Sequence, residues 1–167
     1  MKPTQLLTVV FAFSIIAVVY CKTYVTPSEQ CSGGDFDNLR ERIQVIPCGK
    51  TKCKLQRGTN TTVIFKFRPK YEVRSLTNKV YANIAGIPLP FIGVNEVSAC
   101  PQVTRADTGE RAACPLAPDQ EYTYTNVFFI ESFYPTVDLR VHWGLYDGKR
   151  DVICFEVPAT ITPAKKQ

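Results

Sequence analysis

The residues of this chain that could carry chemistry are a single histidine, His142, and a set of seven cysteines. A hydrolytic triad needs a histidine base that an acid orients. His142 lies on the polar side of an alternating segment, and the chain contains no G-x-S-x-G nucleophile motif. We therefore interpret His142 as a surface histidine rather than a catalytic base.

Other enzyme classes find no better support in the sequence. A glycosidase would use two carboxylates, but the 15 acidic residues are too many and too scattered for any pair to stand out. No glycine-rich loop that could cradle a phosphate is present. We expect the protein not to be an enzyme and to need no cofactor.

The N-terminus has the features of a secretory signal. A lysine precedes an uncharged run from Leu6 to Tyr20, as in the cationic start and apolar middle of such signals. Val19 and Cys21 are small enough for the two positions that signal peptidase recognises. A retained signal anchor is the alternative, but the run is shorter than the ~20 residues that a membrane span needs. We expect a signal peptide over residues 1–21 and one secreted domain over residues 22–167.

Cleavage after position 21 leaves six cysteines. An even number is typical of an oxidising compartment, where disulfides form. Six cysteines allow fifteen pairings, and their spacing does not choose among these. Zinc is the competing use of cysteine, but no C-x-x-C pair occurs and His142 is far from any cysteine cluster in the sequence. We expect no metal. The six are Cys31, Cys48, Cys53, Cys100, Cys114 and Cys154.

The charge of the chain is mildly positive and evenly scattered. Loss of Lys2 with the signal lowers the net charge from +5 to +4. No stripe of basic residues is present, so nucleic-acid binding is not expected. The Lys165-Lys166 pair lies in a proline-containing tail, and we interpret it as a solvated terminus.

Two-residue alternation of apolar and polar side chains recurs along the chain and predicts strands. The clearest case is the segment from Asp138 to Tyr146. Its apolar positions, which should face a core, are Leu139, Val141, Trp143 and Leu145. Asp147-Gly148 then predicts a tight hairpin, because glycine tolerates the positive φ that such turns require.

The remaining strands are short, and no helix alternates with them. A strand from Asp151 to Ile161 should follow the hairpin. Twelve prolines punctuate the chain, and the pattern predicts an all-β fold, an antiparallel β-sandwich. Further strands are expected over residues 42–46, 61–67, 79–85 and 121–130.

Asn60-Thr61-Thr62 is the one N-glycosylation sequon of the chain. In a secreted protein this motif predicts an exposed asparagine at the start of its strand. We expect Asn60 to carry a glycan.

Large apolar side chains gather beside prolines in two segments. The first is Gly86-Ile87-Pro88-Leu89-Pro90-Phe91, which two prolines prevent from pairing as an interior strand. The second is Val127-Phe128-Phe129-Ile130, followed closely by Phe133-Tyr134-Pro135, and it is too apolar for an ordinary exposed connection. These residues either cap the core or line a binding site, and composition does not decide between the two.

These segments carry a resemblance to a known family. The order of the six cysteines, Pro47-Cys48 with Cys53, the segment at 86–91 and Cys114-Pro115 with Tyr122-x-Tyr124-x-Asn126 together resemble the ML (MD-2-related lipid-recognition) domain. Tyr134-Pro135, the Trp143 strand and Cys154-Phe-Glu-Val-Pro158 extend the match over nearly the whole mature chain. Within the family, the sequence is most similar to the Niemann-Pick type C2 sterol carriers of arthropods.

The resemblance implies an immunoglobulin-like sandwich of seven or eight strands with an apolar lipid cavity between the sheets. It also implies the disulfides Cys31–Cys154, Cys48–Cys53 and Cys100–Cys114. By position in the family, Phe91, Ile130 and Tyr134 would form the entrance. The deeper lining would be Val45, Leu55, Val63, Phe65, Leu89, Tyr124, Phe129, Val141, Trp143, Phe155 and Val157.

The implied function is secreted lipid binding and transfer by a monomer, with membranes or a receptor as donors and acceptors and the lysosome as an alternative destination. The sequence departs from vertebrate sterol carriers at Asn83, Phe129, Phe155 and the long Cys100–Cys114 loop. Sterol, fatty acid or a similar apolar signal molecule, and microbial lipid therefore remain open as ligands. Asn83 is a candidate buried amide that a ligand oxygen could satisfy. The alternative class is an extracellular interaction protein or immune co-receptor.

Overall fold

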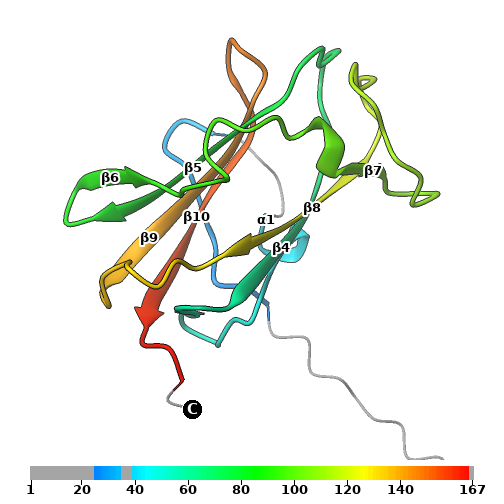
Figure 1. The fold of residues 1–167 in the computed structure, drawn as a ribbon. Coiled ribbons are helices and arrows are strands. Elements are labelled where there is room, and N and C mark those ends of the chain that lie inside the picture. The colour runs from blue at the N-terminus through cyan, green and yellow to red at the C-terminus, as the bar shows by residue number, and fades with distance from the viewer. Residues whose placement is uncertain (1–24, 35–38, 166–167) are drawn as a thin grey trace, which may run out of the picture.

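The computed structural model describes residues 25–34 and 39–165 of the chain. Over these residues it is a sandwich of two β-sheets that face each other across one hydrophobic core (Figure 1). The prediction of an all-β, immunoglobulin-like sandwich is confirmed. Ten strand segments are present, and five of them are no longer than four residues. The predicted signal peptide at 1–21 lies outside the described residues.

The larger sheet has six strands, and its centre is the β9–β10 hairpin. The predicted strand from Asp138 to Tyr146 is found with those bounds, and its partner extends to Thr162. β3 joins this sheet by pairing parallel to β10. The other strand pairs of the sheet are antiparallel. The strands are β1 (Glu29–Gln30), β10 (Asp151–Thr162), β9 (Asp138–Tyr146), β5 (Thr77–Ile84) and β6 (Ile87–Pro90) in spatial order, with β3 (Cys53–Gln56) beside β10.

The smaller sheet has four antiparallel strands, and β4 and β8 form its centre. Their ladder runs without a register shift from Asn60↔Phe129 to Phe67↔Tyr122. A one-turn helix, α1 (Leu39–Arg42), and a 3₁₀ turn, η1 (Cys100–Gln102), lie outside the sheets. The strands in spatial order are β2 (Ile43–Ile46), β4 (Asn60–Phe67), β8 (Tyr122–Phe129) and β7 (Val103–Arg105).

Three disulfides tie the periphery to the sheets. The structure contains the pairs that the family resemblance implies. Cys31–Cys154 links residues 123 positions apart and fastens the segment after β1 to β10. Closing so long a loop restricts the unfolded chain strongly, which is one account of how disulfides stabilise a fold. Cys48–Cys53 and Cys100–Cys114 close shorter loops.

The β5–β6 hairpin projects from one end of the larger sheet (Figure 1). Its turn has positive φ at Ala85 and Gly86, the conformation that tight two-residue hairpins need. Asn83 supports the turn, because its Oδ1 accepts a hydrogen bond from the Gly86 N–H at 2.9 Å. β6 tolerates its two prolines since it is the edge strand of the sheet.

Among the described residues, no helix is long and apolar enough to cross a membrane. Asn60, the sequon asparagine, is exposed and is the first residue of β4. Its glycosylation stays a prediction.

Candidate functional site

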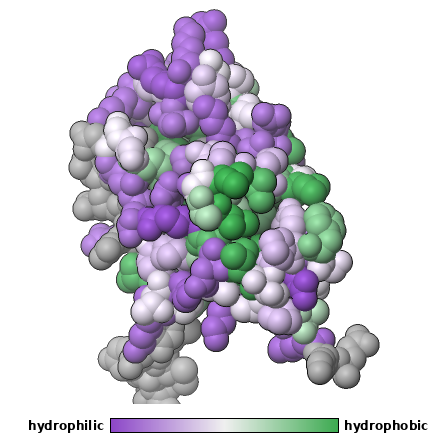
Figure 2. Space-filling model, turned by 90° about the vertical axis from the view of Figure 1, so that its left-hand side faces the viewer, coloured by the Kyte–Doolittle hydropathy of each residue, from purple (hydrophilic) through white to green (hydrophobic). Residues whose placement is uncertain are grey.

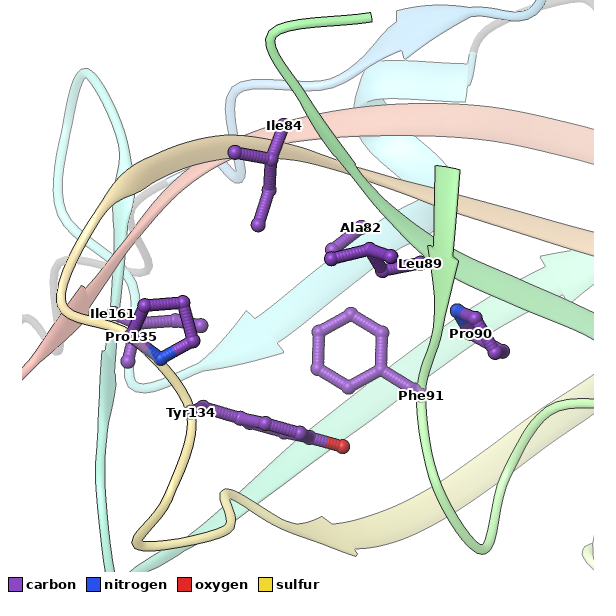
Figure 3. Close-up of a pocket in the computed structure, with 8 residues that line it drawn as sticks. All are labelled: Ala82, Ile84, Leu89, Pro90, Phe91, Tyr134, Pro135 and Ile161. Carbon is purple, nitrogen blue, oxygen red and sulfur yellow. The ribbon is translucent and has the colours of Figure 1, made fainter. Parts of the chain in front are cut away.

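An apolar cavity of about 50 Å³ opens beside the β5–β6 hairpin; we call it the mouth cavity. Figure 3 shows the ring of Phe91 at its centre, with the ring of Tyr134 below and Ile84 on the opposite side. Three parts of the chain form it: the hairpin, the connection after β8 and the end of β10. The lining residues are Ala82, Ile84, Leu89, Pro90, Phe91, Tyr134, Pro135 and Ile161.

Phe91 is the central wall of the mouth cavity, and it is only 3% exposed. Its ring meets Tyr134 edge-on, with centroids 5.8 Å apart. On its other side it meets Phe128 edge-on at 5.7 Å. The Tyr134 hydroxyl accepts a hydrogen bond from the Ile92 N–H at 3.1 Å, which fastens the connection after β8 to the residue that follows Phe91.

A second apolar cavity, the inner cavity, lies between the two sheets and measures about 20 Å³. That is room for about one water molecule, so the sheets are packed closely on each other in this structure. Both sheets contribute to its wall. The lining residues are Val45, Cys53, Leu55, Val63, Phe128, Val141, Trp143, Phe155, Val157 and Ala159.

A row of four aromatic rings leads from the mouth cavity to the inner cavity. Tyr134 contacts Phe91, Phe91 contacts Phe128, and Phe128 contacts Trp143 at 5.5 Å. Tyr134 and Phe91 line the mouth cavity, whereas Phe128 and Trp143 line the inner one. At the Phe91–Phe128 contact, a wall residue of the mouth cavity therefore touches a wall residue of the inner cavity.

A buried polar cluster joins the two sheets beside this aromatic row. The Tyr124 hydroxyl of β8 donates to Asn78 Oδ1 of β5 at 2.7 Å and accepts from Asn126 Nδ2 at 2.9 Å. Asn78 is 1% exposed and also donates to the Val97 carbonyl. Burial raises the pKa of Tyr124 far above its ordinary value, so the hydroxyl stays protonated. This cluster joins β8 of the smaller sheet to β5 of the larger sheet by a direct hydrogen bond between side chains.

Most of the predicted deep residues do lie between the sheets. Phe65 and Tyr124 are fully buried and stack on each other at 4.7 Å, but they pack in the core rather than line either cavity. Leu89 is a rim residue, 47% exposed, that lines the mouth cavity. The predicted deep residues that line the inner cavity are Val45, Leu55, Val63, Val141, Trp143, Phe155 and Val157.

Two predictions at the end of β8 are wrong. Phe129 is 46% exposed and points away from the core, and Phe128 takes the inward place. Side chains of a strand alternate between faces, so Tyr124 and Phe129, five residues apart on an unbroken ladder, cannot both point inward. Ile130 is completely buried and does not line the mouth cavity. Two-residue alternation of inward and outward side chains, counted from Tyr124, would have identified Phe128 as an inward side chain.

The hypothesis that Asn83 is a buried amide in the slot is also wrong. Its neighbours Ala82 and Ile84 line the mouth cavity, so the side chain of Asn83 belongs to the opposite face of β5. The Gly86 N–H already occupies its oxygen. Asn78, five positions earlier, is the buried amide of this strand, and no pattern in the sequence singled it out.

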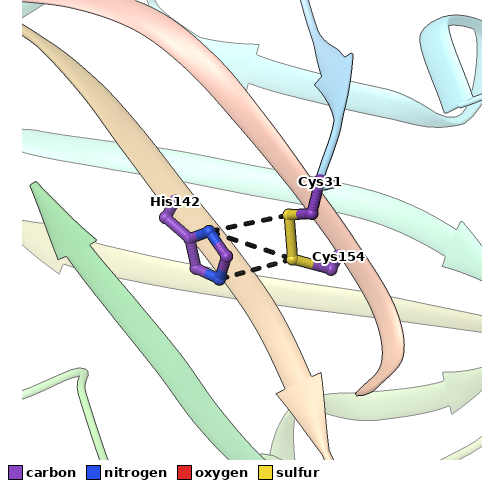
Figure 4. Close-up of side chains that lie close together, drawn as sticks. All are labelled: Cys31, His142 and Cys154. Atoms are coloured by element: carbon purple, nitrogen blue, oxygen red, sulfur yellow. Dashed lines mark hydrogen bonds between the residues drawn. A yellow bond between two sulfur atoms is a disulfide. The ribbon is translucent and has the colours of Figure 1, made fainter. Parts of the chain in front are cut away.

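His142 is not the surface histidine that the sequence predicted. Its side chain is only 12% exposed, and it stacks on Tyr81 with ring centroids 4.2 Å apart. Figure 4 shows its ring against the Cys31–Cys154 disulfide, with Nε2 3.3 Å from Cys154 Sγ. Burial lowers the pKa of His142, while the carboxylate of Glu156 opposes this shift. The two sulfurs are bonded to each other, so this cluster does not offer thiolate ligands for a metal.

The rim of the mouth cavity is unusually apolar for a protein surface. Ile87 is 61% exposed, Ile92 is 59% exposed and Phe133 is 66% exposed. Figure 2, which faces the hairpin side of the molecule, shows a hydrophobic patch near the centre of this face, with hydrophilic residues above it and to its left. Exposed apolar patches with polar borders mark sites where a protein or a membrane binds.

Comparison with known proteins agrees with this architecture. The family model described as the ML domain matches residues 25–161. The protein named NPC intracellular cholesterol transporter 2 from Bos taurus is 27% identical over 158 residues, which is 94% of this chain and 98% of that protein. The ecdysteroid-regulated 16 kDa protein of Manduca sexta is 29% identical over 115 residues, 69% of this chain and 74% of that protein.

A solved structure shares the fold. The crystal structure of a Niemann-Pick type C2 protein from the Japanese carpenter ant superposes with a TM-score of 0.64 at 26% sequence identity, and the match covers 80% of this chain and 98% of that one. The family model spans both sheets and every residue that lines the two cavities. The chain therefore belongs to the ML domain family.

Proposed function

We propose that this protein is a secreted carrier that binds an apolar lipid, a sterol or a fatty-acid-like molecule, between its two sheets and transfers it. The observation that carries the proposal is the pair of apolar cavities, one at the mouth and one between the sheets, whose wall residues Phe91 and Phe128 are in contact. The names of the related proteins support it, since one is a cholesterol transporter and another a Niemann-Pick type C2 protein.

Binding requires that the sheets part and that Phe91 rotates. A lipid that fills the merged cavities gains about 0.8 kcal/mol for each CH₂ that it buries, from which the loss of ligand freedom and the opening of the core are subtracted. Val141, Trp143, Phe155 and Val157 would contact the buried part of the lipid. A polar head group would stay at the mouth beside the Tyr134 hydroxyl.

The route of the protein is part of the proposal. A signal peptide over residues 1–21 would direct it out of the cell, and a glycan on Asn60 could add routing to lysosomes. We expect a monomer over residues 22–167, whose partners are a lipid and the membrane or receptor that exchanges it.

Mass spectrometry of the organic extract of the secreted protein tests the proposal, together with titration of fluorescent sterol and fatty-acid probes. We expect a lipid in about equimolar amount and probe binding that the extracted lipid reverses. An extract without lipid and no binding of either probe would refute it.

The apolar rim favours a second candidate function, an extracellular interaction protein or immune co-receptor that docks through Ile87, Ile92 and Phe133. It predicts that a partner protein is retained on the immobilised chain, and that Phe133→Ser abolishes this while Phe91→Leu does not. Retention of lipid without retention of protein would favour the carrier.

A further inference from the structure

The smaller sheet carries exposed apolar side chains on its outer face, the face turned away from the core. Ile46 is 46% exposed, Val127 is 56% exposed and Phe129 is 46% exposed. Their chain neighbours Val45 and Phe128 line the inner cavity, so these three side chains point outward. We call the three residues the outer patch. An exposed apolar patch of this kind marks a place where a partner binds.

The predicted glycan would be attached inside the outer patch. Asn60 is an exposed residue of β4, and its register partner is Phe129 of β8. Two residues further along β4, Thr62 pairs with Ile46 of β2 on one side and with Val127 of β8 on the other. Side chains two residues apart in a strand share a face. The sequon asparagine therefore lies on the same face as the three exposed apolar side chains.

The backbone fixes Asn60 beside Phe129. Just before the ladder of β4 and β8, the Ile130 N–H donates to the Thr59 carbonyl at 2.9 Å, and the Gly58 N–H donates to the Ile130 carbonyl at 2.8 Å. The Cβ atoms of residues directly opposite each other in an antiparallel pair are about 4.5–5.5 Å apart. A sugar on the Asn60 amide is therefore within reach of the Phe129 ring.

We infer that the Asn60 glycan covers the outer patch, with the C–H face of its first N-acetylglucosamine packed on the ring of Phe129. The inference rests on the glycan that the proposed function attaches to Asn60, and it gives that glycan a role in the folded state. A pyranose ring has apolar C–H groups on its faces and hydroxyl groups around its edge. It therefore covers an aromatic ring by dispersion contacts while its polar groups stay in water.

The attachment of the sugar favours it over other partners of the outer patch. Because the sugar is tethered beside Phe129, the contact does not cost the translational freedom that a separate molecule loses on binding. A second copy of the chain or a membrane would also have to displace a bulky glycan from the same face.

Trimming of the glycan tests the inference. Glycoprotein secreted by eukaryotic cells is compared with the same protein after an endoglycosidase has left only the first N-acetylglucosamine, and with residues 22–167 made in the bacterial periplasm without sugar. We expect the two forms that keep the first sugar to unfold at the same temperature. The form without sugar should unfold about 2–4 °C lower, the shift that the loss of one favourable contact causes in a domain of this size.

Phe129→Ser should remove this dependence on the sugar, so that every form of the variant unfolds at one temperature. Val97→Ser is the matched control. Val97 is 43% exposed, but its carbonyl accepts the N–H of Asn78 in β5 of the larger sheet. It should keep the full shift. Equal shifts in Phe129→Ser and the unmutated protein would overturn the inference.

NMR of the unmutated glycoprotein provides a readout that does not depend on stability. The C–H signals of the first N-acetylglucosamine should move upfield when the protein folds, because the face of the Phe129 ring shields them. Phe129→Ser should abolish this movement. Sugar signals that stay in place on folding, or an Asn60 that mass spectrometry finds unmodified in the secreted protein, would overturn the inference.

The other partners of the outer patch are outcomes of the same comparison. If the glycoprotein dimerises, or adsorbs to phosphatidylcholine vesicles, and Phe129→Ser abolishes this, the patch belongs to a second copy or to a membrane and the inference is overturned. Probe binding by the same samples tests the carrier function separately.

Discussion

The ring of Phe91 stands edge-on against the ring of Tyr134, with centroids 5.8 Å apart and ring planes at 88°. The next residue of the chain, Ile92, donates its N–H to the Tyr134 hydroxyl. The segment after β6 and the connection after β8 therefore hold each other across the mouth cavity. A rotation of Phe91 would break its contact with Tyr134 or Phe128, so we expect this side chain to control the entry of a lipid.

Replacing Phe91 with leucine should speed the release of lipid. Leucine keeps most of the buried volume, so we expect the free energy of unfolding to fall by only about 1 kcal/mol. The two edge-on contacts are lost, and the dissociation rate of a fluorescent sterol should rise about fivefold or more. Stopped-flow displacement measures this rate.

Phe129→Leu is the matched control for that experiment, because Phe129 follows Phe128 in β8 but is 46% exposed and lines neither cavity. It should leave the dissociation rate unchanged. Equal rates for Phe91→Leu and the unmutated protein would mean that the lipid enters elsewhere.

Tyr124→Phe should destabilise the fold by about 1–3 kcal/mol, because the change leaves the buried Asn78 amide and the partly buried Asn126 amide without their shared partner. Urea unfolding followed by circular dichroism measures the free energy. Tyr122→Phe is the control, since the Tyr122 hydroxyl accepts one backbone N–H, that of Ala117, and should cost less. An unchanged free energy of unfolding in Tyr124→Phe would show that the cluster does not stabilise the contact between the sheets.

His142 should make the protein less stable in mild acid. Burial lowers its pKa in the folded state below the ordinary value of 6.5, and the charge of Lys79 adds to this shift; together they outweigh the carboxylates of Glu156 and Asp151, which raise the pKa. The unfolded chain therefore binds the proton more readily than the folded one. The contribution of His142 to the free energy of unfolding is complete above its pKa in the unfolded state. It is lost as the pH falls through its pKa in the folded state.

Urea unfolding at a series of pH values from about 7.5 to about 5 measures this effect. His142→Gln should flatten the dependence of the unfolding free energy on pH, whatever it does to stability at neutral pH. Asp138 and Asp147 are carboxylates whose pKa values are lowered, and they contribute to the pH dependence of the unfolding free energy in both proteins alike. Parallel curves for the two proteins would contradict the prediction.

The apolar rim should speed the exchange of lipid with membranes. Phe133 is 66% exposed beside the mouth, and its insertion into a bilayer would gain roughly 1–2 kcal/mol. Phe133→Ser should slow transfer of a fluorescent sterol to phosphatidylcholine vesicles about fivefold, without changing the affinity for the sterol in solution. Val97→Ser is the control, since Val97 is 43% exposed but lies beside Asn78, at the other end of β5 from the hairpin.

Strands and turns are the part of this fold that local sequence patterns predict. The strand from Asp138 to Tyr146 was predicted with its bounds and its inward side chains, because alternation along one strand is a local property that the sequence displays directly. The hairpin at Asp147-Gly148 depends on its own turn residues in the same way: Asp147 Oδ1 accepts the N–H groups of Lys149 and Arg150. Local periodicity and local turn chemistry were sufficient for the β-sandwich.

The site required contacts between distant parts of the chain. By its place in the alternating pattern, His142 belongs to the polar face of its strand. The ring of Tyr81 on the neighbouring strand and the Cys31–Cys154 disulfide nevertheless cover it. Asn78 is buried because Tyr124 of the opposite sheet supplies its partner. The sequence by itself determined which segments become strands and which of their faces are apolar, since these follow from neighbours along the chain. Only the tertiary structure decided which apolar residues border a cavity and which polar atoms lack a partner, because both depend on how two sheets meet.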